Sequence, residues 1–328
     1  MMRKIAAIDI GSNAVRLLIT SVEEELFGPS FKKISLIRIP LRLGEDSFSI
    51  GKITHIRTIK LIKAMKSFKN LMDIYEVECY RACATAAMRD AKNGKKIIGK
   101  ILEKAKINVE IIDGSVEAKI IYESHMADRL NSDKTYLYVD VGGGSTEISL
   151  ITNGELVRSK TYNIGTVRLL NNKVKTEEYE KLHVDLEELK EQYEITDIIG
   201  SGGNIIKLNT LAKVRKDRKL SLTALEALNE NLKQYTVEEL IEKYELKPDR
   251  ADIITLAADI YIDVAKSVGA KSFIVPKIGL IDGIVHILYT VWKEKRAAEE
   301  KKKEKKREKK NKPVVIEVVE AEPVNNEN

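Results

Sequence analysis

Apolar and polar residues alternate along the chain with two different periods. In the first part, short apolar runs predict strands, and two segments with an apolar residue at every third or fourth position predict helices. Three of the strands follow one another without a helix between them, so we expect a meander. The expected strands cover 5–8, 15–19, 33–39, 79–83 and 109–112, and the expected helices cover 54–72, 93–106 and a segment that opens at 115–116.

The remainder of the chain repeats this order of elements. A helix expected over 250–268 is apolar nearly all round, and Asp252, Asp259 and Asp263 argue for a buried core helix rather than a membrane span. A last strand is expected at 272–275, followed by a helix that starts near residue 280. The other strands are expected at 136–141, 148–151, 156–163 and through 198–199, and the other helices at 176–191, 223–232 and 236–244.

Two apolar strands lead into an aspartate and a turn of small residues, and each turn leads back into a strand. The first copy has Asp9 before the turn 11–13, and the second has Asp140 before the turn 142–146 and Glu147. Glycine lets backbone N–H groups close on an anion because no Cβ is in the way. We therefore interpret the repeat as a duplicated phosphate-binding device.

A third glycine turn follows the strand through 198–199. The turn reads Gly200-Ser201-Gly202-Gly203-Asn204 and runs into a helix. One Asp-x-Gly after a strand is a weak signal, but two in equivalent positions together with this turn are a strong one.

Length and charge suggest two globular domains and a charged tail. The chain has 328 residues, of which 43% are hydrophobic, and we expect domains over 1–123 and 124–297, with the last helix of the second packing back on the first. Residues 298–328 are expected to form a charged helical extension and a disordered end. Residues 293–312 hold 12 Lys/Arg and 5 Glu, a net of +7, and residues 313–328 hold 4 Glu, so of the net charge of +6 the remaining body carries +3 and is nearly balanced. The globular part therefore gives no general argument for membrane binding or for specific nucleic-acid binding.

The cysteines and histidines predict no zinc site. Cys79 and Cys83 are read as thiols in a reducing compartment, although redox chemistry or metal binding is an alternative for such a pair. The four histidines do not cluster, so any metal is expected to be Mg²⁺ with oxygen ligands. The apolar opening at 5–8 is too short for a signal peptide or a membrane span, which favours a cytoplasmic protein.

The duplicated turns resemble the superfamily of sugar kinases, actin and heat-shock ATPases. That resemblance implies an α/β fold with two ribonuclease-H-like domains around a central phosphate-binding cleft, and it leaves the reaction open. Six further motifs lie in order at 84–93, 111–118, 140–147, 164–169, 250–252 and 279–283. They are similar to signatures of the exopolyphosphatase and guanosine pentaphosphate phosphohydrolase (Ppx/GppA) family.

The family resemblance implies roles for two residues. Glu117 matches the catalytic glutamate, which would orient and deprotonate the attacking water. Its alternative role is that of a stabilising negative charge in the first turn of a helix. Arg89 would bind the terminal phosphate through two parallel hydrogen bonds, and its alternative role is that of a surface arginine at a helix start.

The same resemblance implies phosphate and metal ligands. Phosphates would lie against backbone amides and short polar side chains of both turns, and the third turn would bind a base, a further phosphate or nothing. Mg²⁺ would be held by Asp140 and Glu147, with Asp9 as the third candidate, although these carboxylates could instead bond turn amides. The expected phosphate ligands are Gly11, Ser12, Asn13, Gly142, Gly143, Gly144, Ser145 and Thr146, and those of the third turn are Gly200, Gly202, Gly203 and Asn204.

The chain departs from the family pattern in two ways. Many members have two glutamates before the alanine, whereas this chain has Val116 and Glu117, which leaves metal binding and the pKa of Glu117 open. The chain also stops without the extra C-terminal domains of longer members. This suggests shorter polymers or lower processivity.

The function expected from these observations is Mg²⁺-dependent hydrolysis of the terminal phosphate of inorganic polyphosphate. Guanosine pentaphosphate is the alternative substrate, because its 5′-triphosphate presents an equivalent end. An actin-like or sugar-kinase ATPase, or a non-catalytic sensor of polyphosphate or alarmone that signals through the tail, are alternatives of other classes. The family resemblance also implies a homodimer.

Overall fold

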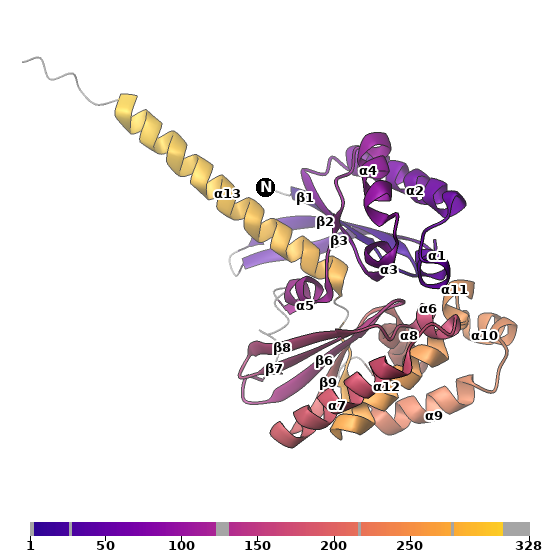
Figure 1. The fold of residues 1–328 in the computed structure, drawn as a ribbon. Coiled ribbons are helices and arrows are strands. Elements are labelled where there is room, and N and C mark those ends of the chain that lie inside the picture. Colours follow the sequence, from indigo (N-terminus) through magenta and orange to yellow (C-terminus); the bar gives the residue numbers. More distant parts are fainter. Residues whose placement is uncertain (1–2, 26–27, 123–130, 216–217, 277–278, 311–328) are drawn as a thin grey trace, which may run out of the picture. The chain divides into compact units, whose positions relative to one another are not determined.

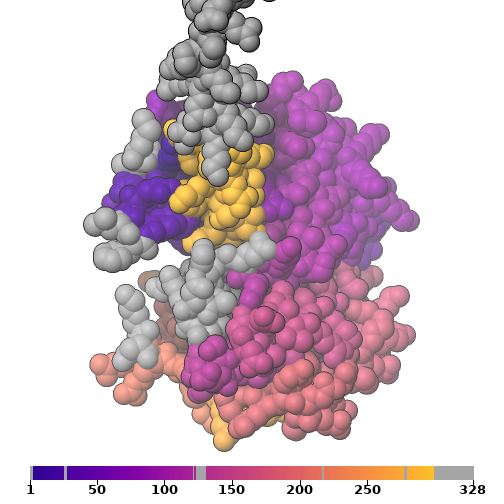
Figure 2. Space-filling view, turned by 90° about the vertical axis from the view of Figure 1, so that its left-hand side faces the viewer, coloured from indigo at the N-terminus to yellow at the C-terminus, as the bar shows by residue number. Residues whose placement is uncertain are grey.

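The structure is a computed structural model that describes residues 3–25, 28–122, 131–215, 218–276 and 279–310. The chain forms two compact units, Met1–Leu288 and Tyr289–Asn328. The first unit contains two α/β lobes, each built on one sheet, and Figures 1 and 2 show them from two sides. The second unit is described only as the continuation of helix α13 (Leu280–Lys310). The disordered end expected at 313–328 lies outside the described residues.

The first lobe is built on a five-stranded sheet in the order β3-β2-β1-β4-β5. β1 pairs antiparallel with β2 and parallel with β4, and β2 pairs antiparallel with β3, which confirms the expected meander. The strands are β1 (Arg3–Ile10), β2 (Val15–Glu25), β3 (Gly28–Ile39), β4 (Cys79–Ala84) and β5 (Glu110–Ile111).

Two long and two short helices accompany this sheet. The long helices α2 (His55–Ile74) and α4 (Gly94–Ala105) bury apolar residues at helical spacing, among them Leu61, Phe68 and Ile101. The short helices α1 (Leu43–Ile50) and α3 (Ala86–Asp90) were not expected, because segments of five to eight residues show too few apolar repeats.

The second lobe is built on a six-stranded sheet in the order β10-β11-β9-β6-β7-β8. Its strands are β6 (Thr135–Val141), β7 (Thr146–Thr152), β8 (Glu155–Tyr162), β9 (Ile195–Ser201), β10 (Leu220–Ser221) and β11 (Ser272–Ile274). Its helices include α6 (Thr166–Leu170), α7 (Thr176–Gln192), α8 (Gly203–Leu211), α9 (Leu222–Leu232) and α10 (Val237–Tyr244).

The helix expected over 250–268 is confirmed from residue 254 onward, but its expected start is wrong, because the structure has two helices there. They are α11 (Pro248–Ala251) and α12 (Ile254–Val268). The break lies where two carboxylates reach the first lobe: Asp249 pairs with Arg38, and Asp252 pairs with Arg42 at 2.6 Å. The ion pairs with the first lobe therefore favour a break that the apolar pattern does not predict.

In the described segments, no helix combines the length and the apolar character that crossing a bilayer requires.

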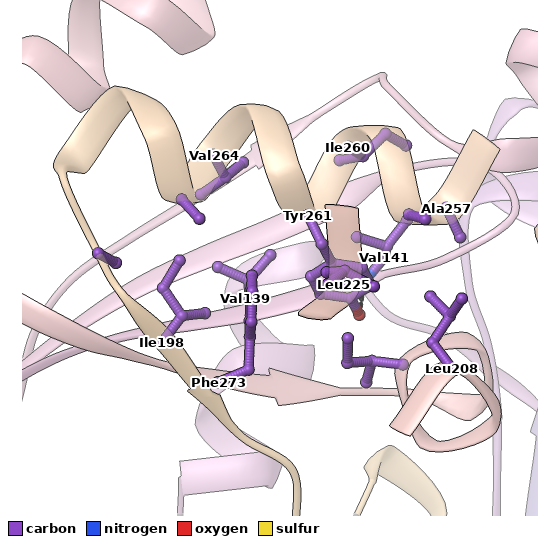
Figure 3. Packing of buried hydrophobic residues seen from close by; sticks show 14 of the residues in the cluster. Val139, Val141, Ile198, Leu208, Leu225, Ala257, Ile260, Tyr261, Val264 and Phe273 are labelled. Carbon is purple, nitrogen blue, oxygen red and sulfur yellow. Dashed lines mark hydrogen bonds between the residues drawn. The ribbon is translucent and has the colours of Figure 1, made fainter. Parts of the chain in front are cut away.

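Tyr261 of α12 connects the core of the second lobe to the ends of two strands. Its ring is buried between the helix and the sheet, next to Phe273 (Figure 3). Its hydroxyl accepts the Val141 N–H at 3.1 Å and donates to the Ser201 C=O at 2.5 Å. Val141 ends β6 and Ser201 ends β9, so this one side chain fixes the starting points of two glycine turns.

The parallel strands of each lobe end at one edge of their sheet. β1, β4 and β5 run parallel in the first sheet, and β6, β9 and β11 run parallel in the second. In α/β sheets, ligands bind outside the carboxyl ends of such strands. The three turns predicted from the sequence follow β1, β6 and β9, which places them at these ends. The domain limits expected at 123 and 297 stay predictions.

We predict that Tyr261→Phe lowers the free energy of unfolding by about 1–3 kcal/mol, because it leaves a buried N–H and a buried C=O without their partner. Urea denaturation measures the change. Tyr244→Phe, which removes an exposed hydroxyl bonded to Asn231, is the matched control and should change stability by less than about 0.5 kcal/mol. Equal effects of the two substitutions would contradict the role assigned to Tyr261.

Candidate active site

The two aspartate turns close with the same backbone hydrogen bond. In the first turn, the Gly11 N–H donates to the Ala14 C=O at 3.1 Å, and in the second the Gly142 N–H donates to the Ser145 C=O at 2.9 Å. Both turns connect antiparallel strands, β1 with β2 and β6 with β7. The duplication read from the sequence is therefore also a duplication of turn geometry.

Helix α1 fixes the orientation of the first turn. The Ser12 C=O accepts the Gly44 N–H at 2.9 Å, and the Asn13 C=O accepts the Arg42 N–H at 2.9 Å. In a planar trans peptide the N–H points away from the C=O of the same unit. With both carbonyls held by the α1 segment, the N–H groups of Asn13 and Ala14 are directed to the opposite side, which is the cleft.

Helix α6 fixes the second turn in the same way. The Gly142 C=O accepts the Thr166 N–H at 3.0 Å, and the Gly143 C=O accepts the Val167 N–H at 2.8 Å. The guanidinium of Arg168 donates through Nε to the Gly144 C=O at 2.6 Å. The N–H groups that follow these carbonyls, at residues 143, 144 and 145, are directed to the cleft. Within the described part of the chain, no acceptor is found for them.

Glycine is required where the two turns approach each other. A Cβ on Gly144 would lie 2.5 Å from the Phe48 ring, 2.7 Å from Ala86 and 2.8 Å from the Ser12 hydroxyl. A Cβ on Gly143 would lie 3.1 Å from the Ser12 Cβ. These atoms belong to the first lobe, so a side chain at Gly144 would push the lobes apart.

Four carboxylates line the pocket beside the turns. They are Asp9, Glu117, Asp140 and Glu147, and each is at most 9% exposed. The two lobes differ at equivalent positions of their hairpins: Asp9 lies opposite Arg16, whereas Asp140 lies opposite Glu147. The first hairpin therefore presents a carboxylate with a cation, 3.7 Å apart, and the second presents two carboxylates.

Burial raises the pKa values of all four carboxylates, and repulsion from neighbouring carboxylates raises those of Asp9, Glu117 and Glu147 further. Burial is the largest cause for all four, and repulsion from Glu147, Asp140 and Asp9 raises the pKa of Glu117 further, against a lowering by Arg89. The pKa of Glu147 is raised to about 7, with repulsion from Asp140 as the second cause. A positive ligand in this pocket would relieve the repulsion.

Glu117 reaches the pocket from helix α5 (Gly114–Tyr122), whose start is fixed locally. The Asp113 carboxylate accepts the Val116 N–H at 2.9 Å and the Ser115 hydroxyl at 2.6 Å, so it caps the helix. Gly114 packs directly against the Thr161 side chain of β8, where a Cβ would clash. These contacts place the first turn of α5 against the second sheet.

Three arginines that the sequence analysis did not single out line the same pocket. They are Arg16, Arg38 and Arg250, which come from β2, β3 and α11. Burial, together with the charges of Arg38 and Arg16, lowers the pKa of Arg250 to about 10. The Arg250 Nε is buried and has no hydrogen-bond partner within the described residues. Arg250 lay within the motif at 250–252, but nothing in its sequence position indicated that it would meet Arg16 and Arg38.

Three of the predicted site residues do not line the pocket. Thr146 is fully buried, and its hydroxyl donates to the Ile164 C=O at 2.6 Å. Gly200 lies within β9, against Ile205. The Arg89 guanidinium donates to the Ile112 C=O at 3.1 Å, although its charge still lowers the pKa values of Glu117 and Glu147.

The other predicted residues lie together at the pocket. These are Asp9, Gly11, Ser12, Asn13, Glu117, Asp140, Gly142, Gly143, Gly144, Ser145, Glu147, Gly202, Gly203 and Asn204. The Ser145 hydroxyl donates to Glu147, and the Asn13 amide donates to the Asp249 C=O at 3.0 Å. Both side chains therefore also hold neighbouring groups in place.

The donor set suits Mg²⁺. The ligands available beside the turns are carboxylate oxygens, and Asp140 is oriented by the hydroxyls of Ser201 at 3.1 Å and Tyr138 at 3.3 Å. Gly202 has φ +93°, and a Cβ there would lie 2.6 Å from Asp140 Oδ1, so glycine keeps this oxygen accessible. Across the described residues, no three His, Cys, Asp or Glu side chains form a ready-made metal cage. Mg²⁺ usually takes one or two protein carboxylates and keeps several waters.

Comparison with known sequences identifies relatives over most of the chain. Residues 18–289 match the Ppx/GppA phosphatase family. The bifunctional 3-dehydroquinate synthase/phosphatase of Fusobacterium nucleatum is 29% identical over 299 residues, which are 82% of this chain and 44% of that protein. The guanosine-5′-triphosphate,3′-diphosphate pyrophosphatase of Photobacterium profundum is 26% identical over 296 residues, which are 86% and 58% of the two chains. The chain thus spans about half the length of these curated relatives.

A solved structure has the same fold over nearly its whole length. An exopolyphosphatase from Cytophaga hutchinsonii superimposes with a TM-score of 0.75 at 25% identity, covering 88% of this chain and 97% of that chain. This likeness confirms the fold class expected from the sequence, two ribonuclease-H-like lobes of the actin and sugar kinase type.

We predict that Glu147→Gln stabilises the metal-free protein above pH 7 and has no such effect near pH 4.5. The pKa of Glu147 is about 7 in the folded protein and 4.5 ordinarily, so its contribution to stability is present below pH 4.5 and is lost as the pH rises through 7. Glutamine avoids this loss, which amounts to about 1–3 kcal/mol at pH 8.5.

Urea denaturation in EDTA at pH 8.5 and pH 4.5 measures this difference, and exposed Glu187→Gln serves as the control. A destabilised Glu147→Gln protein at pH 8.5 would show that the pocket does not hold its carboxylates under electrostatic repulsion.

Proposed function

The chain belongs to the Ppx/GppA phosphatase family, and from this premise we propose that it is an exopolyphosphatase that hydrolyses the terminal phosphate of inorganic polyphosphate with Mg²⁺. The observation that carries the proposal is that Glu117 lines the same pocket as the residues of both turns. Phosphoryl transfer requires a positioned nucleophile and compensation of charge on the phosphate oxygens. The named exopolyphosphatase with the same fold adds support.

In the proposed reaction, a water oxygen bonds to the terminal phosphorus while the bond from that phosphorus to the bridging oxygen breaks. Glu117 accepts the proton of the water, and the products are orthophosphate and a polymer shorter by one unit. The N–H groups of the two turns would bind the phosphate oxygens, as would Arg16, Arg38 and Arg250. Asp140 and Glu147, with Asp9, would hold Mg²⁺, which would neutralise developing charge.

The electrostatics of the pocket support a basic role for Glu117. A general base works best when its pKa lies near the working pH, and burial among other carboxylates raises the pKa of Glu117 well above its ordinary 4.5. The rate of phosphate release should therefore rise with pH as Glu117 loses its proton.

Arg89 remains a proposed ligand of the terminal phosphate, which would require its guanidinium to leave the Ile112 C=O.

Guanosine pentaphosphate is a second candidate substrate. One relative is named for that class of activity, and the cluster of three arginines next to the turn 202–204 offers more positive charge than a terminal phosphate needs. A second phosphate group on a nucleotide, or further units of a polymer, would equally suit these arginines. The ATPase and sensor alternatives, the homodimer and the cytoplasmic location stay predictions from the sequence.

We predict that Glu117→Gln releases orthophosphate from tripolyphosphate at least about 100-fold more slowly than the unmodified protein in Mg²⁺, because removal of a general base typically costs this much. Guanosine pentaphosphate and ATP are assayed in parallel, and Glu187→Gln is the surface control. Equal rates for Glu117→Gln and the unmodified protein would remove Glu117 from the mechanism. If only guanosine pentaphosphate is hydrolysed, it is the substrate in place of polyphosphate. If polyphosphate or guanosine pentaphosphate binds tightly and is not hydrolysed, the protein is a sensor.

A further inference from the structure

We propose that the outer surface of α2 and α4 binds the part of a long polyphosphate that lies outside the cleft. The proposal rests on the proposed function and adds a second binding site to it. We call this surface the lysine face. It consists of Lys60, Lys63, Lys66 and Lys69 on α2 and Lys95, Lys96, Lys100 and Lys104 on α4.

The lysines of this face lie on two neighbouring helices of the first lobe. α2 and α4 pack against each other, and Figure 1 shows them side by side on the side of the lobe away from the second sheet. Six of the eight lysines are exposed, and Lys69 and Lys100 are partly exposed. On α2 the lysines recur at every third residue, which is less than one helical turn, so the row crosses the exposed side obliquely.

Little negative charge accompanies these lysines. Asp73 and Glu103 are the acidic residues of the two helices, and Lys69–Asp73 is the one ion pair that a lysine of this face forms within the described residues. α7 of the second lobe has the opposite composition, with seven acidic residues and two lysines. The first lobe as a whole shares the excess of positive charge, because residues 1–113 hold 21 Lys/Arg against 13 Asp/Glu, whereas 114–292 hold 23 against 28. Such segregation favours binding of a polyanion over simple solubility.

Helix α3 lies between the cleft and the lysine face. Thr85 and Ala86 line the pocket at the start of α3, and α3 packs against α4. The exposed Lys92 lies between these helices in the sequence, and Lys95 and Lys96 follow in the first turn of α4. The pocket has a volume of about 100 Å³, which is below the roughly 300–1,000 Å³ of a typical small-molecule site. A polymer of more than a few units must therefore continue outside it, and α3 leads to the lysine face.

Polyphosphate fits this face better than RNA does. Single-stranded nucleic acids are bound by positive grooves combined with aromatic side chains on which the bases stack. Phe68, the one aromatic residue of α2 and α4, is fully buried. A face with charge and no stacking platform matches a polyanion without bases. The sequence analysis expected short polymers as substrates. With this surface as a second binding site, a longer polymer could also be bound.

The test uses two variants of the full chain in which four lysines are replaced by glutamine, Lys60, Lys63, Lys66 and Lys69 in one and Lys95, Lys96, Lys100 and Lys104 in the other. Phosphate release is measured with long-chain polyphosphate and with tripolyphosphate at two salt concentrations. We expect KM for the long polymer to rise at least about tenfold and its salt dependence to weaken, since each lost phosphate contact removes about 0.7 from the logarithmic slope. The kcat/KM for tripolyphosphate, which lies within the cleft, should stay within about twofold.

A matched control replaces four exposed lysines of the second lobe, Lys173, Lys175, Lys190 and Lys213, by glutamine and should leave KM for the long polymer unchanged. Normal tripolyphosphate turnover in a variant shows that it has folded. If both variants keep KM for the long polymer while tripolyphosphate is hydrolysed, the lysine face is not a binding site and the proposed function stands.

Direct binding separates the two proposals. If the unmodified protein hydrolyses no polyphosphate, the proposed function fails. Titration of the protein with fluorescent long-chain polyphosphate in EDTA still tests whether the lysine face binds the polymer. Loss of binding in both lysine variants supports the lysine face as a binding site, and binding equal to that of the unmodified protein overturns it. Tighter binding of RNA with the same number of phosphates, lost in the same variants, would assign the face to RNA and also overturn the proposal.

Discussion

The site depends on hydrogen bonds that hold the carbonyl groups of two short turns. Carbonyls of 12–13 are held by backbone N–H groups of the α1 segment, and those of 142–144 are held by α6 and Arg168. With each C=O turned outward, the adjoining N–H has to face the cleft. The helices α1 and α6 are thus parts of the site, although neither supplies a side chain predicted to bind phosphate. Tyr261 adds a third anchor, because it fixes the ends of β6 and β9 from the core of the second lobe.

The same cleft combines an electropositive and an electronegative side. Inward N–H groups and three arginines suit phosphate oxygens, while four buried carboxylates repel one another and have raised pKa values. Burying repelling carboxylates costs stability, and binding of a cation would offset this cost. The duplication is asymmetric at one decisive position, where Arg16 in the first hairpin corresponds to Glu147 in the second. The first hairpin therefore pairs its carboxylate with a cation, whereas the second presents two carboxylates that could hold a metal ion.

Much of this arrangement follows from the sequence, and the remainder depends on contacts between segments distant in the chain. The meander, the long helices and the fold class were predictable because each rests on local periodicity or on the repeated Asp-x-Gly turn. The family motifs predicted that Glu117 belongs to the phosphate site, and Glu117 does line the pocket beside the two turns. Its catalytic role stays a prediction. The pattern missed the break before α12, where Asp249 and Asp252 reach arginines of the other lobe. It also missed Arg16, Arg38 and Arg250, since three cations on separate elements meet only after folding.

The central claim is that the two pinned turns together bind the end of a polyphosphate next to Glu117. The most direct measurement is a crystal structure of Glu117→Gln grown with Mg²⁺ and tripolyphosphate. The account predicts phosphate oxygens within hydrogen-bond distance of the N–H groups of Asn13 or Ala14 and of Gly143 to Ser145, with residue 117 facing the terminal phosphorus. Tripolyphosphate bound away from either turn, or residue 117 turned out of the cleft, would contradict it.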